Sequence, residues 1–201
     1  MYEKMPNENY FEKFSKMNRM EQQFQERTAN HIRAVQKKCA RIEQYDPERF
    51  KGLTAIARKH DQSKYEAPEK EPYVYITWYY HTRDDGTPWA MPADMIEKTA
   101  EATEHHVKNN AHHPEFYSQQ TDTINKSDRD APPDKKVIAT NMPDIYIAEM
   151  VADWVSVSEE RGTSPIDWAD KNIGVRWEFD QDQIDLIYEL IDLIWLNPKV
   201  Y

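Results

Sequence analysis

The segment from about Tyr10 to Gln44 contains neither glycine nor proline, and no other feature constrains the fold as strongly. Phe11, Phe14, Met17, Met20 and Phe24 recur within it every three or four residues, which predicts a long helix with one apolar side. The whole chain has only four glycines, few for a sheet-rich fold with many tight turns. We therefore expect an all-α, single-domain helical bundle with little or no β structure.

Start and stop signals predict the further helices. They are expected over Pro47–His60, Pro92 to about Asn110, 141–162, a short segment that begins around Ser164 and Pro165, and 180–196, where Asp180 and Gln183 have capping-box spacing. The segment YVYITWYY (73–80) fits either a strand or a buried helical turn. The polar residues 118–136, with a proline pair, predict a long exposed loop.

A chain of 201 residues suits one domain. We expect residues 1–201 to form it, with a core over about 29–160. The last predicted helix is apolar around most of its circumference, so 161–201 should either pack on that core or form the interface of a homodimer.

The net charge of −10 argues against extended nucleic acid as a partner, because such binding depends on clustered Lys and Arg. The single cysteine, Cys39, excludes an internal disulfide and fits a reducing compartment. No apolar run reaches the roughly 18–20 residues of a bilayer span, and the N-terminus lacks the apolar region of a signal peptide. We expect a cytoplasmic protein without a membrane partner.

Four of the seven histidines lie in the stretch ATEHHVKNNAHHPEFY (102–117). If the helix continued through it, His106 and His113 would share one face, with His105 and His112 on an adjacent line. The alternative to a functional role is that these histidines are neutral and lie at a solvent-exposed end of a helix. Two pairs so close together favour a functional role.

Three further candidates lie elsewhere in the chain. His60 and Asp61 are adjacent at the end of a predicted helix, and His31 lies within the first helix. Asp153 is flanked by apolar residues, so its carboxylate should be buried and needs either a metal or a cationic partner. His31 could equally be a surface histidine.

The order His31, His60–Asp61, histidine cluster, Asp153 resembles the HD-domain superfamily of metal-dependent phosphohydrolases, which are helical bundles. The stretches HDQSKYEAPEKEPY, HHVKNNAHHPEFY and EMVADW are more narrowly similar to a group of phage and bacterial proteins with HD-SK, HH, HH-E and D-W motifs, over about Ala29 to Val155. The resemblance implies that His31, His60, Asp61 and Asp153 bind a divalent ion. Imidazole and carboxylate together suit Mn, Fe, Co, Ni, Zn or Mg.

The resemblance also implies a role for the histidine cluster. Either His106 and His113 bind a second ion, or the four histidines line the pocket, with His105 and His112 as proton donors or phosphate contacts. His81 competes for the place of the additional ligand. Glu115 is expected to orient one of these histidines by a hydrogen bond to the ring nitrogen that does not face the ion.

Lys64 marks a departure from the nucleotidase branch of the superfamily, which commonly has a glutamate acid or base three residues after the His-Asp pair. Lys64 is expected to hold a phosphate or the leaving oxygen, with a solvated lysine as the alternative. Glu66 and Glu69 are the nearby substitutes for the missing acid.

The leading hypothesis is hydrolysis of a small phosphate ester, most simply a nucleotide or a related metabolite, by metal-activated water. One rival is a di-iron oxygenase of the HD type, because such proteins share the extra histidines. Another is a non-catalytic helical protein with structural metal. Candidates for stacking on a substrate are Trp78, Tyr79, Trp89 and Tyr117.

Overall fold

The computed structural model describes residues 7–87, 89–125 and 131–196, and the side chains of 13–87, 89–125 and 131–195. Its elements are α1 (Asn7–Tyr45), α2 (Leu53–Ala57), the 3-10 helix η1 (Gln62–Tyr65), α3 (Lys70–Asp84), α4 (Ala93–Asn109), the 3-10 helix η2 (Pro114–Tyr117), β1 (Val137–Ile138), α5 (Asp144–Arg161), α6 (Pro165–Asn172), β2 (Trp177–Glu178), α7 (Gln181–Ile191) and the π-helical turn η3 (Asp192–Leu196). The all-α prediction is confirmed. The described strands are two residues long each.

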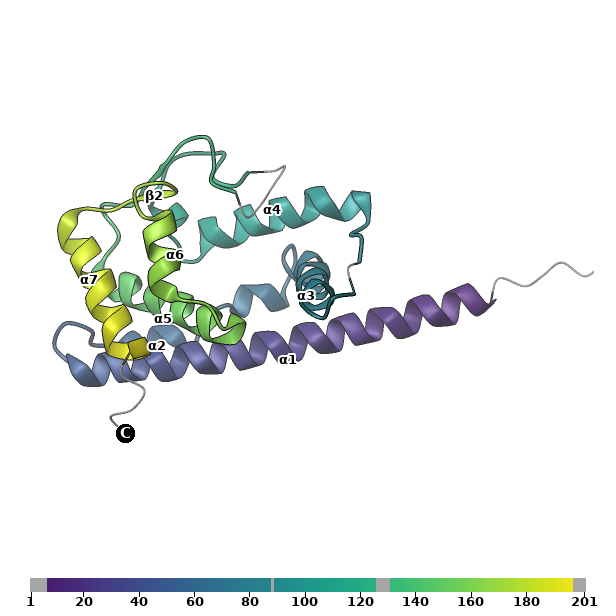
Figure 1. Ribbon diagram of the computed structural model, residues 1–201, viewed down its shortest axis with the longest axis horizontal. Coiled ribbons are helices and arrows are strands. Elements are labelled where there is room, and N and C mark those ends of the chain that lie inside the picture. The colour runs from purple at the N-terminus through teal and green to yellow at the C-terminus, as the bar shows by residue number, and fades with distance from the viewer. Residues whose placement is uncertain (1–6, 88, 126–130, 197–201) are drawn as a thin grey trace, which may run out of the picture.

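Helix α1 runs along the base of the molecule, and the other helices lie on one side of it (Figure 1). Helix α3 is viewed nearly end-on, so it crosses α1 and α4 steeply. Helices α5, α6 and α7 gather over the C-terminal half of α1. The candidate residues of α1, α4 and α5 can therefore face one another across the interior.

The main core lies between α1, α2, α5 and α7. Val35, Ile42, Leu53, Met150 and Ile187 are all fully excluded from solvent there. At about 25 cal/mol per Å² of apolar area removed from water, this packing is the main stabilising contribution to the fold. Leu186, Leu190 and Ile191 of α7 belong to the same core, so the last long helix packs within the chain.

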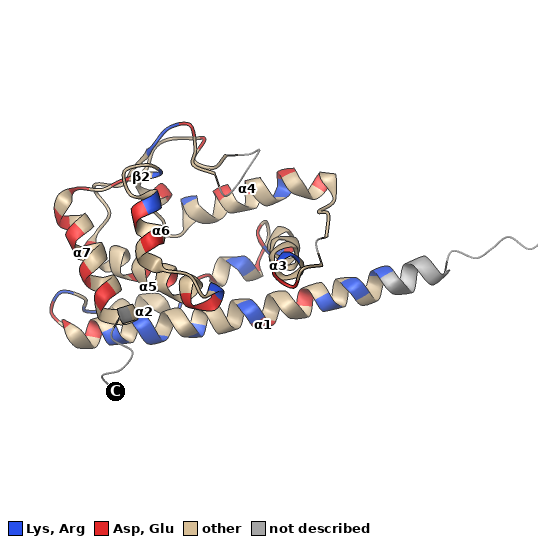
Figure 2. Cartoon of the chain, viewed as in Figure 1, with Lys and Arg blue, Asp and Glu red and all other residues tan. Residues whose placement is uncertain are grey.

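Ion pairs fix α1 against α5 at the surface. Arg27 Nε lies 2.7 Å from Glu160 Oε1, and Lys38 Nζ lies 2.6 Å from Glu159 Oε2. Figure 2 shows several basic bands along α1 and mainly acidic ones along α7. Within the described ranges, every helix is too short or too polar to traverse a bilayer.

Several helix ends form as predicted. Gly162 ends α5 in the left-handed conformation at φ 64°, which a residue without a Cβ adopts at little cost. Ser164 Oγ accepts from the backbone N–H of Asp167 at the start of α6. Asp180 and Gln183 form a capping box at the start of α7.

The predicted helix Pro47–His60 is wrong in its extent. Gly52 has φ 96°, which interrupts helical geometry, and α2 covers only Leu53–Ala57. Glu43 of α1 caps the new start, accepting from the backbone N–H groups of Gly52 at 2.7 Å and Thr54 at 2.8 Å. His60 and Asp61 consequently lie in the turn after α2 rather than in a helix.

The segment 73–80, which the sequence left undecided, is helical and lies within α3. The predicted exposed loop 118–136 is partly outside the described residues, at 126–130, and the Phe11 side chain also lies outside them. The end of this loop forms β1, which pairs in parallel with β2 through Val137 with Trp177 and Ile138 with Glu178. This pairing anchors the segment that carries Arg176 and Trp177.

Candidate metal centre

Four side chains from three parts of the chain converge on one point. His31 Nε2 lies 3.0 Å from Asp153 Oδ1 and 3.6 Å from Asp61 Oδ2. His60 Nε2 lies 3.3 Å from His31 Nε2 and 3.8 Å from Asp61 Oδ2. Ligands about 2.1 Å from one ion lie roughly 3.0–3.4 Å apart at octahedral or tetrahedral angles. We name these residues donor set A, and their spacing fits one divalent ion after small adjustments.

A second group of donors lies on the other oxygen of Asp61. His106 Nε2 lies 3.1 Å and His112 Nε2 3.8 Å from Asp61 Oδ1. His106, His112 and His113 form a group whose ligand atoms all lie within 4.8 Å of one another. We name Asp61, His106, His112 and His113 donor set B. Asp61 belongs to both sets, one oxygen to each.

The backbone at Asp61 explains how one residue serves both sets. Asp61 has φ 58°, the left-handed region that Asp visits more readily than most residues. Such a conformation costs of order 1–3 kcal/mol and persists only where the surrounding structure enforces it. The turn points the carboxylate inward, where it is 1% exposed.

The helix predicted over Pro92 to about Asn110 is confirmed as α4, and it does not continue through the histidine cluster. Helix α4 ends at Asn109, and Asn110 is extended at φ −117° and ψ 118°. The chain turns back, so that the rings of His112 and His113 lie 5.9 Å and 4.9 Å from that of His106. A turn, rather than a shared helix face, brings these histidines together.

Buried carboxylates orient two of the rings. His60 Nδ1 lies 3.0 Å from Glu149 Oε1, and His106 Nδ1 lies 2.8 Å from Glu69 Oε2. When Nδ1 donates to a carboxylate, the Nε2 lone pair is left for an ion, as is usual for metal-binding histidines. Glu69 and Glu149 are 0% and 3% exposed, so these contacts are shielded from water.

Several donor atoms of set B form no aligned hydrogen bond with the described residues, although His106 Nε2 lies 3.1 Å from Asp61 Oδ1. These donor atoms are Asp61 Oδ1 and the Nε2 atoms of His106, His112 and His113. A buried polar atom without a partner costs roughly 1–3 kcal/mol. Their convergence is what a bound cation would satisfy, so the residues present fit a metal ion.

The pKa shifts differ between the two sets. In set A, burial opposes the charge of His60, but Asp61 and Glu149 outweigh it and raise the pKa of His60 above its usual value. In set B, burial lowers the pKa of His112 well below its usual value and that of His113 to about 3. Burial by itself raises the pKa of Asp153, but the hydrogen bond from His31 outweighs it, and the result lies below the usual range. Burial likewise opposes ionisation of Asp61, and Lys64 and His60 overcome it.

Lys64 contacts the shared aspartate directly. Its Nζ donates to Asp61 Oδ2 at 2.6 Å and lies 4.9 Å from the centre of the Tyr73 ring. Burial opposes its charge, but Asp61 raises its pKa above the ordinary value. An ammonium that is charged near neutral pH therefore lies beside the donor sets.

Most of the other predicted site residues lie away from the two sets, whereas Glu69 contacts His106 of set B. His105 is 41% exposed at its side chain and contacts Glu69 Oε1 at 2.8 Å. Glu66 is exposed at the end of η1. His81 lies 3.4 Å from Asp85 in α3. Glu69 is fully buried against His105, His106 and Ser63, which gives it a positioning role.

The predicted role of Glu115 is wrong. Its Oε1 accepts from Trp177 Nε1 at 2.8 Å instead of orienting a histidine. Glu69 and Glu149 orient the rings, and the sequence reasoning missed Glu149. A signal was present, because Glu149 precedes Asp153 by four residues and shares its helix face.

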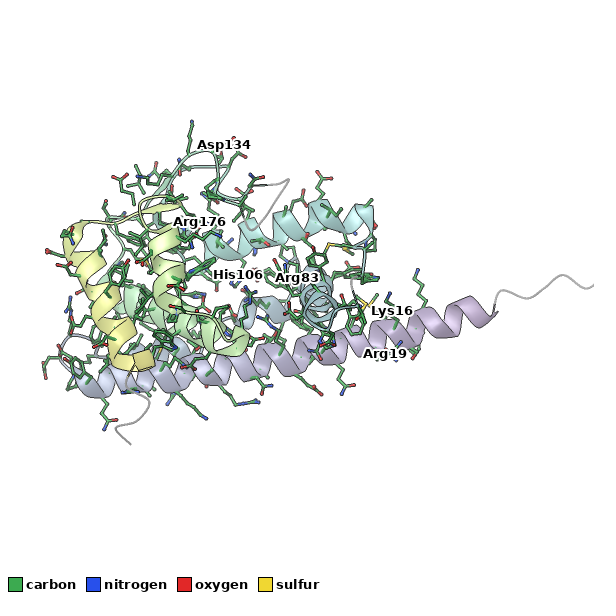
Figure 3. The ribbon with its side chains drawn as sticks, viewed as in Figure 1. Lys16, Arg19, Arg83, His106, Asp134 and Arg176 are labelled. Carbon is green, nitrogen blue, oxygen red and sulfur yellow. The ribbon has the colours of Figure 1, made fainter. Side chains whose placement is uncertain are left out.

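A cavity of about 220 Å³ adjoins the two sets. Asp153 and His113 line its inner end, and Trp154, Trp168 and Trp177 line its walls. We name it the tryptophan cavity. The predicted stacking residues lie elsewhere: Trp78 beside His81, Tyr79 beside Tyr80, Trp89 beside Tyr75 and Tyr117 beside Tyr146. Figure 3 labels His106 in the interior below α4, and Arg176, which also lines the cavity, above it.

Comparison with known proteins identifies one family. The model of a family of unknown function, DUF5662, matches residues 20–193, a range that contains both donor sets and the tryptophan cavity. No curated protein and no solved structure matches the chain.

Proposed function

The chain belongs to the DUF5662 family, and we propose that it is a metal-dependent phosphohydrolase that acts on a nucleotide or a related small phosphate ester. The arrangement of Asp61 supports this most directly. Its two oxygens face separate groups of imidazole nitrogens, and buried carboxylates hold His60 and His106 with Nε2 turned toward it.

Donor sets A and B would hold one or two divalent ions. When bound, such an ion supplies water of lowered pKa and positive charge for the phosphoryl oxygens. A mixed imidazole and carboxylate environment suits Mn, Fe, Co, Ni or Zn, and Mg if water completes its shell. If two ions bind, Asp61 would contribute to holding both, since one of its oxygens faces set A and the other faces set B, and the two ions would together stabilise the attacking and leaving oxygens.

The chain's own residues would then bind and position the ester. With Asp61 engaged at the centre, the Lys64 ammonium is free to turn from Oδ2 to a phosphoryl oxygen, and it can donate a proton to the leaving oxygen. Glu69 and Glu149 keep the rings of His106 and His60 fixed. The low exposure of His60 and Asp61, 1% each, strengthens each electrostatic contact.

The resemblance to HD-type proteins is consistent with this proposal, and so is the acidic net charge of −10. Local cations suffice for a small phosphate, whereas extended nucleic acid would require a basic surface. The low pKa of His112 and His113 argues for metal binding rather than acid catalysis at these residues, because both stay neutral and keep a lone pair.

Elemental analysis of the purified protein, followed by a phosphate-release screen over nucleotides and small phosphate esters, tests the proposal. We expect His60→Ala and Asp153→Ala to lose metal and activity while retaining helical content by circular dichroism. His81→Ala is the matched control, because His81 lies away from both sets. Full metal occupancy in both site variants would contradict the proposal.

One observation favours a second candidate, a di-iron oxygenase. Donor set B adds three histidines beyond the ligands of a single-ion centre, and nitrogen-rich donor sets suit iron. Two irons per chain together with substrate-dependent oxygen consumption would support the oxygenase. Phosphate release without oxygen, with Mn, Co or Mg, would support the hydrolase.

A further inference from the structure

The tryptophan cavity shares one lining residue with each donor set and therefore suits the part of a ligand that is not the phosphoryl group. Asp153 belongs both to set A and to the cavity lining, and His113 belongs both to set B and to the lining. A group bound at the two sets would therefore continue into this cavity.

The cavity is small. Its volume is about 220 Å³, whereas pockets for drug-sized ligands measure roughly 300–1,000 Å³. The cavity is too small to enclose a nucleoside. The part of the ligand that it encloses must therefore be a compact group of a few carbon atoms.

The walls of the cavity are rigid and aromatic. Trp154 and Trp177 stack at 5.2 Å between ring centres with an interplanar angle of 18°. Trp177 is fixed further by the hydrogen bond from its indole N–H to Glu115 and by the β1–β2 pairing. Preformed walls bind a ligand at lower entropic cost than mobile ones.

Arg176 and Glu115 give the cavity its polarity, and the two side chains also interact electrostatically with each other. Burial raises the pKa of Glu115, although the hydrogen bond from Trp177 and the charge of Arg176 oppose this shift. Arg176 is 7% exposed, and its guanidinium carbon lies 5.6 Å from the centre of the Trp177 ring. Glu115 is 2% exposed, and its Oε2 has no hydrogen-bond partner among the described residues. Guanidinium groups match carboxylates in geometry, and a buried carboxylate oxygen calls for a donor.

We infer that the tryptophan cavity binds the organic part of a phosphorylated hydroxy or amino acid, with the ligand's carboxylate at Arg176 and its amine or hydroxyl at Glu115. This inference rests on the proposed function, since the metal centre and Lys64 hold the phosphoryl group. Of the two substrate types in that proposal, nucleotides and related small phosphate esters, it selects the second and narrows it to compact esters with a carboxylate and a hydrogen-bond donor.

The test is calorimetric binding to the metal-loaded protein with four probes: inorganic phosphate, O-phosphoserine, phosphoethanolamine and adenosine monophosphate. Phosphoserine carries the carboxylate that phosphoethanolamine lacks, and the nucleotide is too large. We expect phosphoserine to bind about 10- to 100-fold more tightly than phosphoethanolamine, the range expected for a charged hydrogen bond in a shielded site. Adenosine monophosphate should bind no more tightly than phosphate.

Variants separate the cavity from the metal centre. Arg176→Met should abolish the preference for phosphoserine over phosphoethanolamine and leave phosphate binding unchanged. Lys171→Met, at an exposed position of α6, is the matched control and should keep the preference. Val157→Phe, which fills the cavity from α5, should weaken the binding of phosphoserine but not that of phosphate. This second variant keeps the inference testable if the Arg176→Met protein does not fold.

The outcomes are distinguishable. Equal affinities for phosphoserine and phosphoethanolamine, or tight binding of the nucleotide, would overturn the inference while phosphate binding leaves the proposed function in place. A protein that binds neither metal nor phosphate would overturn both.

Discussion

Replacing Glu69 by glutamine removes one negative charge and keeps the shape of the side chain. Glu69 is completely buried and accepts from His106 Nδ1 at 2.8 Å, His105 Nδ1 at 2.8 Å and Ser63 Oγ at 2.9 Å. An amide offers one acceptor oxygen and one donor NH₂ group. At least one of these contacts must therefore be lost or reversed.

The expected loss of metal affinity follows from the contact between Glu69 and His106. Removal of a carboxylate that orients a metal-binding histidine typically lowers metal affinity about 10- to 100-fold, which equals about 1.4–2.7 kcal/mol at 25 °C. The effect should be confined to donor set B, because His60 in set A is oriented by Glu149 instead. We predict that Glu69→Gln weakens one binding event and leaves the other unchanged.

The assay is competition between the protein and a chromophoric chelator for Mn²⁺ or Zn²⁺. Glu71→Gln, at an exposed position in the first turn of α3, which begins directly after Glu69, is the control and should bind metal normally. Thermal unfolding with excess chelator separates metal affinity from stability. Unchanged affinity of every bound ion in a folded Glu69→Gln protein would refute the positioning role of this carboxylate.

Three further predictions concern the shared ligand, acid stability and a helix end. Asp61→Asn, which tolerates the left-handed backbone, should lower occupancy of both sets, and elemental analysis showing loss of only one ion from a two-ion protein would contradict the bridging role. Burial lowers the pKa of His113 from 6.5 to about 3, so between these pH values the unfolded chain binds a proton at this residue and the folded chain does not. The metal-free protein should therefore lose stability as the pH falls through this window. His113→Gln should reduce the dependence of the unfolding free energy on pH, measured by chemical denaturation at each pH. Gly162→Ala, at φ 64°, should lower the free energy of unfolding by about 1–2 kcal/mol, and an unchanged midpoint would show that the end of α5 relaxes freely.

Local signals predicted most of the helices. The caps at Ser164 and Asp180 and the stop at Gly162 depend on neighbouring residues alone, so the sequence reveals them. The interruption at Gly52 was missed because it depends on Glu43, a carboxylate on another helix that caps α2. The segment 73–80 was ambiguous because its aromatic residues suit both a strand and a buried helix.

Residues of the candidate site were predictable to the extent that each carries its own chemistry. His31, His60, Asp61 and Asp153 form donor set A with the short separations described above. Their partners could not be read from local patterns. Tertiary packing brings Glu69 to His106 and Glu149 to His60. Arg176 lies at the tryptophan cavity because β1 pairs with β2.

The central claim is that helices distant in the chain converge on Asp61 to surround divalent ions. Anomalous diffraction from crystals grown with Mn²⁺ tests it most directly. The claim predicts an anomalous peak within coordination distance of Asp61, between His31, His60 and Asp153, and a second one toward His106 if two ions bind. Saturating Mn²⁺ with no anomalous density at Asp61 would contradict it.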